Sequence, residues 1–308
     1  MDDWPYLLLR FLHYAVLLGL FGLTAYRLIG LSWLSSDVQS LRFDRYLIGL
    51  ATLAPLLSAA LMVQSIAAMM GQPLWLTEWA TIEAMIASTS MGWAFAARMA
   101  LLSGALIALL LRHRLAAGLP ITVALYGLAV ASLAWNGHAA ALEGGIGLFH
   151  RVNDAVHLLA AGLWLGAIGW FLHLTIGAHR SPDKTIAGPL LNAMHKFAPL
   201  GMALVAMVAI TGLVNAQMIF GLHNSGTVLT TGYGQLLATK MAIVALMLLC
   251  GGRNALIGKR RAGAVSAGLD TDPTASLAAL RISLSIEIAL AIAVIGLVAI
   301  VGLMSPMS

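Results

Sequence analysis

The feature that most constrains the fold of this chain is a series of eight long apolar segments. An α-helix needs ~20 apolar residues to cross the ~30 Å hydrocarbon core of a bilayer. Because backbone polar groups in lipid must be bonded internally, such segments fold as helices. The sequence therefore predicts an all-α polytopic membrane helix bundle with eight transmembrane helices, forming a single transmembrane domain over 1–308. The expected spans are 6–31, 46–70, 92–111, 115–136, 153–177, 197–220, 233–253 and 281–304.

The composition supports this class. Of the 308 residues, 60% are hydrophobic and 9% are charged, whereas a soluble globular domain has about 25% charged residues. This difference excludes a water-soluble enzyme, a disordered chain and a nucleic-acid-binding module. The single cysteine, Cys250, excludes an internal disulfide and a CxxC metal or redox motif.

The basic residues predict the orientation of the bundle. All of the 17 Lys and Arg residues except Arg10, Arg98, Arg151 and Lys240 fall in or beside loops on one side of the predicted membrane. Cytoplasmic loops carry the excess of Lys and Arg, so that side is predicted to be cytoplasmic. With an even number of spans, both termini are then expected in the periplasm.

Two local patterns suggest how the helices pack. Gly162 and Gly166 form a small-xxx-small step, with Gly169 one turn on, and Gly19 and Gly22 provide small residues in the first span. Such residues allow close approach of helix backbones in lipid. The segment 76–88 is amphipathic and predicts either an interfacial helix on the outer surface or an ordered loop.

Histidines gather at the predicted outer ends of the spans. If the fifth span extends back to His150, then His150, Asp154, His157 and Trp164 form one stripe at helical spacing. His138 follows a glycine at the outer end of the fourth span, and His13 lies one turn inside Arg10. We therefore expect three or four imidazoles to converge from three helices. Ionisable groups inside membrane spans are costly, which makes each a functional candidate.

Methionines bear on which metal such a site would take. Met62, Met69 and Met70 are spaced to share one helical face toward the outer end of the second span. Imidazole binds Zn, Cu, Fe and Ni, whereas thioether sulfur selects soft Cu(I). The predicted metal ligands are His138, His157, His13, His150, Met62, Met69 and Met70. Methionine is also an ordinary filler of apolar cores, so each one alone is a weak indication.

Other polar residues in the spans are expected to support the site or to pair with one another. Lys240 is expected about 10 Å inside the outer edge and Glu287 about 9 Å inside the cytoplasmic edge, from the helix rise. Lys240 is expected to pair with Asp154 or Glu143, and Glu287 with Arg253, Arg281 or Asn254. The supporting residues are Asn153, Asp154, Trp164, Tyr233, Lys240 and Glu287.

Taken in order, these residues resemble the copper-resistance protein D (CopD) family of bacterial inner-membrane proteins. The resemblance covers essentially the whole chain. It is carried by Arg10-Phe-Leu-His13, Gly137-His138-Ala139, Asn153-xxx-His157 followed by Trp164-Leu-Gly166, Met194-His195-Lys196-Phe197, Gly212-Leu-Val-Asn215, the stretch from Gly232 to Lys240, Asn254 and Glu287.

The resemblance implies copper transport across the inner membrane without ATP hydrolysis, beside a periplasmic copper carrier of the CopC type. It points to His13, His138 and His157 as the functional imidazoles, supported by Asn153, Tyr233 and Lys240. The absence of a GxxxxGK[ST] motif agrees with this. The favoured prediction is uptake of Cu(I) from the periplasm through the outer His/Met site, by a protein that is not an enzyme.

Two other functions stay open at this stage. Facing histidines of a helix bundle can ligate haem b, so an electron-transfer protein with bis-His ligation by His138 and His157 is the main alternative. In the other alternative, the protein is a scaffold whose outer histidines only form hydrogen bonds.

Overall fold

A computed structural model describes residues 4–31, 41–112, 114–115, 117–136, 142–180, 187–266 and 273–304. Within these ranges the chain is helical and contains no strand. Eight helices or helical segments are long and apolar enough to cross a membrane, as predicted. The long helices are α1 (Trp4–Gly30), α2 (Leu41–Met69), α4 (Ser90–Leu110), α5 (Gly118–Ala131), α6 (Gly144–Arg180), α7 (Ala187–Phe220), α9 (Gly232–Ser266) and α10 (Pro273–Val301). The short ones are η1 (Leu74–Leu76), α3 (Trp79–Ser88), η2 (Ser132–Trp135), η4 (Leu222–Asn224) and α8 (Ser225–Val228).

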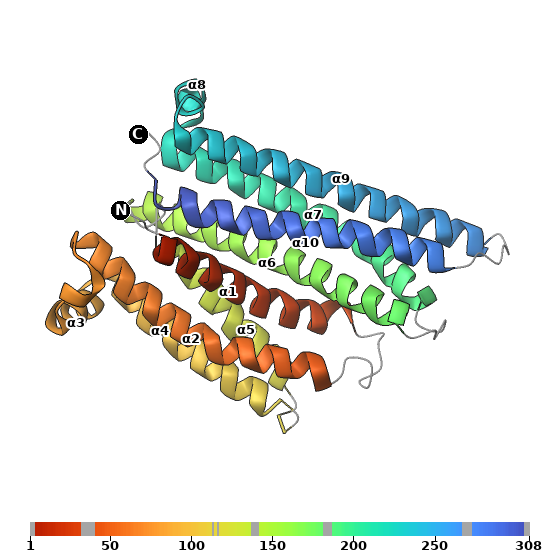
Figure 1. The fold of residues 1–308 in the computed structure, drawn as a ribbon, viewed down its shortest axis with the longest axis horizontal. Coiled ribbons are helices and arrows are strands. Elements are labelled where there is room, and N and C mark those ends of the chain that lie inside the picture. The colour runs from red at the N-terminus through yellow and green to blue at the C-terminus, as the bar shows by residue number, and fades with distance from the viewer. Residues whose placement is uncertain are drawn as a thin grey trace.

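The bundle is built around α1, α6 and α10. Helices α2 and α5 pack on α1, and α4 packs between α2 and α5. On the other side, α7 packs on α6, while α9 contacts both α10 and α7. Helix α1 begins and α10 ends at the same end of the bundle, and α3 and α8 lie there too (Figure 1). We call this the α3–α8 end.

Some helices are longer than the predicted spans. Helix α6 begins at Gly144, whose φ of 65° lies in the left-handed region that favours glycine. The predicted stripe from His150 to Trp164 is therefore part of one helix. Helix α10 begins at Pro273 rather than near 281, so Glu287 lies deeper in the bundle than expected.

Glycines allow close contact between α1 and α6. Their spacing predicted close backbone approach in both spans, but not that these two spans pack on each other. A Cβ atom added to Gly22 would lie 1.9 Å from the Gly162 carbonyl oxygen, and one added to Gly166 would lie 2.0 Å from the Gly22 carbonyl. Gly169 faces the Leu23 side chain. Gly19 was expected to allow close packing as well, but a Cβ there meets nothing within 4 Å.

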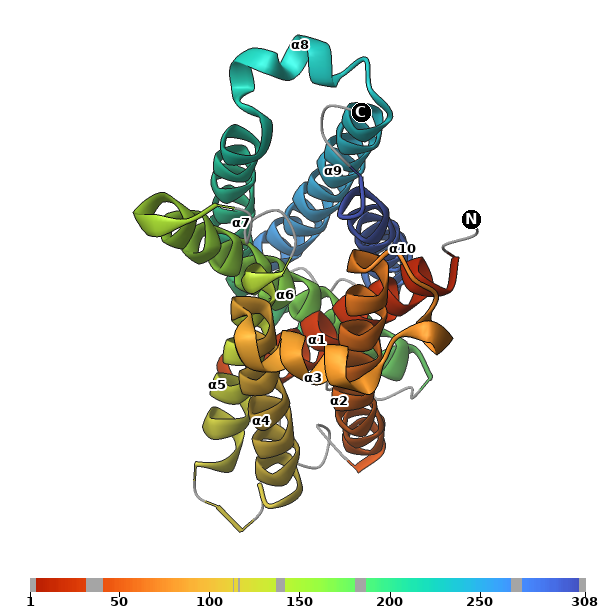
Figure 2. The same cartoon turned by 90° about the vertical axis from the view of Figure 1, so that its left-hand side faces the viewer.

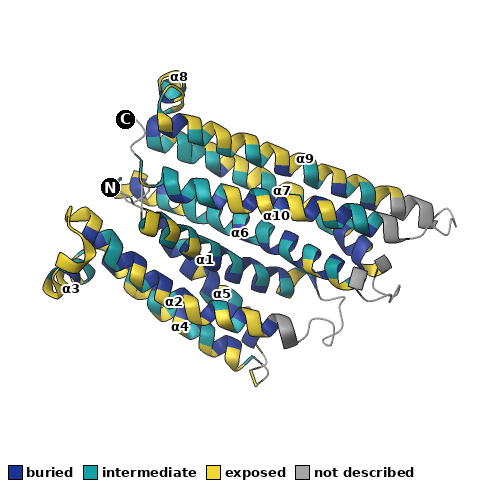
Figure 3. Cartoon of the chain, viewed as in Figure 1, coloured by how far each residue is buried: buried dark blue, intermediate teal, exposed yellow. Residues whose placement is uncertain are grey.

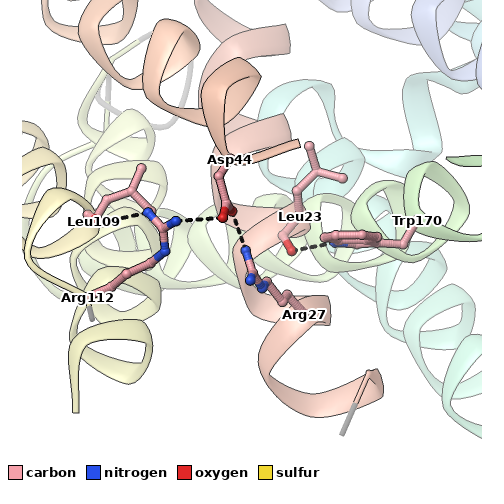
Figure 4. A network of polar contacts seen from close by, with 6 residues as sticks. All are labelled: Leu23, Arg27, Asp44, Leu109, Arg112 and Trp170. Atoms are coloured by element: carbon pink, nitrogen blue, oxygen red, sulfur yellow. Dashed lines mark hydrogen bonds and ion pairs between the residues drawn. The ribbon is translucent and has the colours of Figure 1, made fainter. Parts of the chain in front are cut away.

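Opposite charges join three helices at the other end of the bundle (Figure 4). Asp44, in the first turn of α2, accepts from Arg27 of α1 at 2.6 Å and from Arg112, just after α4, at 2.5 Å. Nearby, the Trp170 indole of α6 donates to the Leu23 carbonyl of α1 at 2.8 Å. These contacts fix how α2 and α4 stand against the α1–α6 pair.

The segment 76–88 contains a helix, α3, and not the ordered loop that was the alternative. It lies across the α3–α8 end of α2 and α4 (Figure 2). Ile82 is buried with Met62 and Ile66, whereas Trp75 and Trp79 are exposed. Exposed aromatic side chains at a bundle end suit the membrane interface. Figure 3 shows that much of the outer surface of the long helices is exposed, as expected where lipid covers apolar side chains.

Candidate functional site

The clearest candidate site is a polar seam between α6 and α7 near the α3–α8 end. Its centre is His157, whose Nδ1 lies 2.9 Å from the Thr211 hydroxyl. That hydroxyl already donates its proton to the Met207 carbonyl at 2.6 Å. Its oxygen therefore accepts from the Nδ1–H of His157. These hydrogen bonds assign the tautomer in which Nδ1 carries the proton and Nε2 is unprotonated, with a lone pair that can bind a metal ion.

The same seam holds the side chains that precede His157 on α6. The Asn153 amide donates to the Thr211 carbonyl at 2.9 Å and to Asn215 Oδ1 at 2.7 Å. In turn, Asn215 donates to Asp154 Oδ1 at 2.9 Å. Asn153 and Asp154 thus belong to the hydrogen-bond network of the seam, while their role in supporting a metal site stays a prediction. Thr211 was missed, although it lies four residues before Asn215 and so shares its helical face.

Charges from neighbouring helices converge on this seam. Lys240 of α9 interacts electrostatically with both Asp154 and His157. Tyr14 of α1 lies within electrostatic range of Asp154 as well. Lys240 and Asp154 are therefore close enough to interact electrostatically, while their direct pairing stays a prediction.

His13 has different surroundings, on the side of α1 that faces α2. It is fully buried, its Nε2 lies 2.7 Å from the Ser58 hydroxyl of α2, and its Nδ1 has no hydrogen-bond partner in the described part of the chain. Arg98 and Arg10 both act electrostatically on it. Because two cations oppose another positive charge, the His13 pocket suits a metal ion less well than the seam does.

Arg98 is a second residue whose role sequence reasoning missed. This guanidinium is almost completely buried in α4. It donates to the Ser132 hydroxyl at 2.8 Å, to the Ser132 carbonyl at 3.1 Å and to Asn136 Oδ1 at 3.2 Å. Asn136 directly precedes the loop that carries His138. Arg98 therefore ties the segment from Ser132 to Asn136 to α4.

Of the four histidines predicted to converge, the structure describes His13, His150 and His157. His138 lies outside the described residues, so its pairing with His157 stays a prediction. His150 is buried on α6, one turn before Asp154. Within the described ranges, no three His, Cys, Asp or Glu side chains are grouped closely enough to hold a metal ion. His13 and His157 bond to different helices, α2 and α7.

The methionines are divided between two environments. Met62 is 3% exposed and packs under α3 with Ile66 and Ile82. Met69 and Met70 are 63% and 48% exposed. They do not share a buried face with Met62, because α2 ends at Met69, beyond its contact with α3. Met62 is therefore a core residue, whereas Met69 and Met70 are accessible thioethers.

The remaining predicted residues, Trp164, Tyr233 and Glu287, have contacts with other residues of the bundle. Trp164 packs at the edge of the apolar cluster around Trp170, and Tyr233 is buried against Phe220. Glu287 accepts from the Asn254 amide at 2.5 Å, which was one of its expected partners. Asn254 is 14 residues beyond Lys240, about 21 Å along α9.

Comparisons with known proteins agree with the resemblance. The N-terminal domain model described as copper resistance protein D-like matches residues 1–148, and the copper resistance protein D model matches residues 191–301. The chain is 32% identical to Copper resistance protein D of Pseudomonas syringae pv. tomato, over 99% of this chain and 98% of that protein.

Two shorter matches involve other named membrane or transport proteins. The chain is 30% identical to Copper transport protein CutJ of Bacillus subtilis (strain 168), over 44% of this chain and 24% of CutJ. It is 32% identical to Inner membrane protein YebZ of Escherichia coli (strain K12), over 38% of each. No solved structure gives a significant match. The full-length relative and the two family models show that this multi-pass membrane protein belongs to the copper resistance protein D family.

Proposed function

We propose that this protein carries copper across the bacterial inner membrane, taking up Cu(I) from the periplasm through a site at His157. The observation that carries the proposal is the hydrogen bond between His157 Nδ1 and the Thr211 hydroxyl, which holds the ring and assigns the tautomer with an unprotonated Nε2. Metal-ligating histidines almost always donate their other ring N–H to such a partner, which fixes the tautomer and orientation of the ring.

Copper fits the chemistry of the donors. Imidazole nitrogen binds copper, and thioether sulfur prefers Cu(I). Met69 and Met70 stand exposed at the α3–α8 end, where they can receive Cu(I) from a periplasmic carrier of the CopC type. His138 is the proposed second imidazole beside His157, with Asp154 offsetting the charge of the ion. The names of the copper resistance and copper transport relatives support this choice of metal.

The test is copper binding and uptake by the purified protein in proteoliposomes loaded with a Cu(I) chelator. Replacing His157 with Ala is expected to abolish both bound copper and uptake, while the protein still inserts. His223→Ala, which changes an exposed histidine in η4, is the matched control and should behave as the wild type does. Unchanged copper stoichiometry in the His157 variant would overturn the assignment.

An absorption spectrum of the same preparation separates copper from haem. The proposal expects copper by elemental analysis and no intense Soret band. A Soret band that disappears in His157→Ala would instead assign the histidine to haem b and reject copper carriage at this residue. A protein that binds neither and remains stable would favour the scaffold.

A further inference from the structure

A second polar site lies between α9 and α10, apart from the proposed copper site. It consists of Glu287 and Ser283 on α10 and Asn254 on α9, with exposed fractions of 2%, 0% and 8%. The Asn254 amide donates to Glu287 Oε1. Ser283 precedes Glu287 by four residues and so lies on the same helical face. Glu287 is about 17 Å of helix rise from Ser276 and about 21 Å from Val301, which places it well inside the span.

No counter-charge accompanies this carboxyl group in the described part of the chain. Helix α10 packs on α1, α6, α7 and α9. The described residue that acts on the Glu287 carboxyl is Asn254, and neither ion pair of the described chain includes Glu287. The titratable side chains with described surroundings that the four helices carry toward this end are Tyr26, Arg27, His173, His195, Lys196, Cys250, Arg253, Lys259 and Arg260, and α10 itself carries Arg281.

An isolated carboxylate in this position would be unfavourable. Leu284 and Ala291, three residues before and four after Glu287, belong to an apolar cluster that includes Trp170 and Met247. Burying an ionised group among such side chains is strongly unfavourable unless another charge compensates it. The carboxyl group is therefore expected to be neutral when no cation is near.

The unpartnered atoms of the site match a protonated acid. Asn254 Oδ1 and Ser283 Oγ are both buried without a hydrogen-bond partner among the described residues. Glu287 Oε1 accepts from Asn254 Nδ2, and Asn254 Oδ1 is an acceptor that still lacks a donor. Protonation gives Glu287 the hydroxyl donor that such an acceptor requires. An ionised carboxylate has no proton to donate and would repel it.

A metal ion fits these atoms less well. Cu(I) prefers sulfur and nitrogen donors to oxygen. A sodium site in a membrane bundle typically recruits backbone carbonyls from unwound helices. Here α9 and α10 are continuous helices through Asn254 and Glu287, so their carbonyls are engaged in the helices. A proton needs only the one carboxyl oxygen and its acceptor.

We propose that Glu287 holds a proton in the membrane interior and releases it as Cu(I) passes, so that copper and proton move in exchange. The balance is one Cu(I) inward for one proton outward, and the released proton leaves a carboxylate that compensates the charge of the passing ion. The exchange rests on the proposed copper transport, whereas the protonated state of Glu287 does not.

The first experiment tests the protonated state without copper. Infrared spectra of the full-length protein in liposomes at neutral pH should show a carboxylic acid C=O band that shifts in D2O. The band is expected to disappear in Glu287→Gln and to persist in Glu83→Gln, which changes an exposed acid of α3. Asn254→Leu should retain the band but move it to higher frequency. Absence of the band in the wild type, or its persistence in Glu287→Gln, would overturn the proposal.

The second experiment tests the exchange. Cu(I) added outside proteoliposomes that contain a pH-sensitive dye should make the lumen alkaline in the wild type, with about one proton lost per copper ion gained. Glu287→Gln should lose this pH change. Replacement of all Na⁺ by choline should alter nothing, and a requirement for Na⁺ would overturn the proton assignment. If the wild type carries no copper while the infrared band is present, the copper function fails and the proton site stands.

Discussion

At the scale of single residues, hydrogen bonds distinguish histidines that look equivalent in the sequence. His157 donates through Nδ1 to a threonine whose own proton is already committed to a carbonyl, so its Nε2 is held ready as a ligand. His13 is bonded through Nε2 instead and lies beside two arginines. Of these two imidazoles, His157 is therefore the better candidate for binding a cation.

Thr211 should matter for copper although it does not touch the ion. Thr211→Val removes the acceptor of His157 Nδ1–H, so the ring can rotate or change tautomer. We expect copper affinity to fall by about 10- to 100-fold, the usual effect of losing such a partner, with little change in expression or thermal stability. Competition with a Cu(I) chelator measures this.

Thr211→Ser is the matched control, since it keeps the hydroxyl and should retain affinity close to that of the wild type. Equal weakening in the Ser and Val variants would show that packing, and not the hydrogen bond, accounts for the effect. Unaltered affinity in Thr211→Val would contradict the role given to the tautomer.

The sequence predicts half of this site. Helical periodicity places Asn153, Asp154 and His157 together, because the spacing within one helix is fixed by its pitch. The partners Thr211 and Asn215 come from another helix, α7, as Ser58 of α2 does for His13. They depend on how far each helix is shifted and rotated against its neighbour, which periodicity does not specify. The same gap explains why Met62 was assigned to a site when α3 covers it.

At the scale of elements, glycines bring the backbones of α1 and α6 into close contact. The sequence indicated close packing at these glycines, and the structure shows which helices they join. Gly22→Ala would place a methyl group on the backbone of Gly162. The helices must then separate, and we expect a loss of about 1–3 kcal/mol in the free energy of unfolding, as in other overpacked cores. Thermal unfolding in detergent or steric trapping in bicelles can measure it.

Gly19 provides the control on the same helix. A Cβ at Gly19 meets no atom within 4 Å, so Gly19→Ala should leave stability unchanged or raise it slightly. A similar loss in both variants would mean that the α1–α6 contact is not the cause.

The ion pairs at the end of the bundle opposite α3 and α8 make a second prediction about elements. Asp44→Asn leaves Arg27 and Arg112 without their shared carboxylate, in a place where all three side chains are largely buried. Breaking a buried charge network in this way typically costs about 3–5 kcal/mol. The Asp44 variant should unfold at a markedly lower temperature in detergent. Arg45→Gln, which changes the exposed neighbour of Asp44, should leave the unfolding temperature unchanged. Equal stability of the two variants would contradict a structural role for Asp44.

At the scale of the whole molecule, the number and order of the spans follow directly from the apolar segments, because lipid permits few other structures. The positions of the helix ends do not follow from the apolar segments. Hydrophobicity stops at the membrane surface, whereas α6 and α10 continue beyond it, as Gly144 and Pro273 show. The apolar span of α10 also begins earlier than predicted, at Ser276 rather than near 281, and so Glu287 lies farther inside it than expected.

The orientation of the molecule in the membrane is the last prediction, and it rests on the distribution of Lys and Arg. If the basic loops are cytoplasmic, the α3–α8 end faces the periplasm, together with the outer end of the His157 seam. Single cysteines introduced into a Cys250→Ser background at Glu78, before α3, and at Lys259, in α9, report the two sides. In spheroplasts, an impermeant maleimide should label position 78 and should reach position 259 only after the membrane is opened. The reverse pattern would place the His157 seam toward the cytoplasm, and copper would then have to enter the protein from inside the cell.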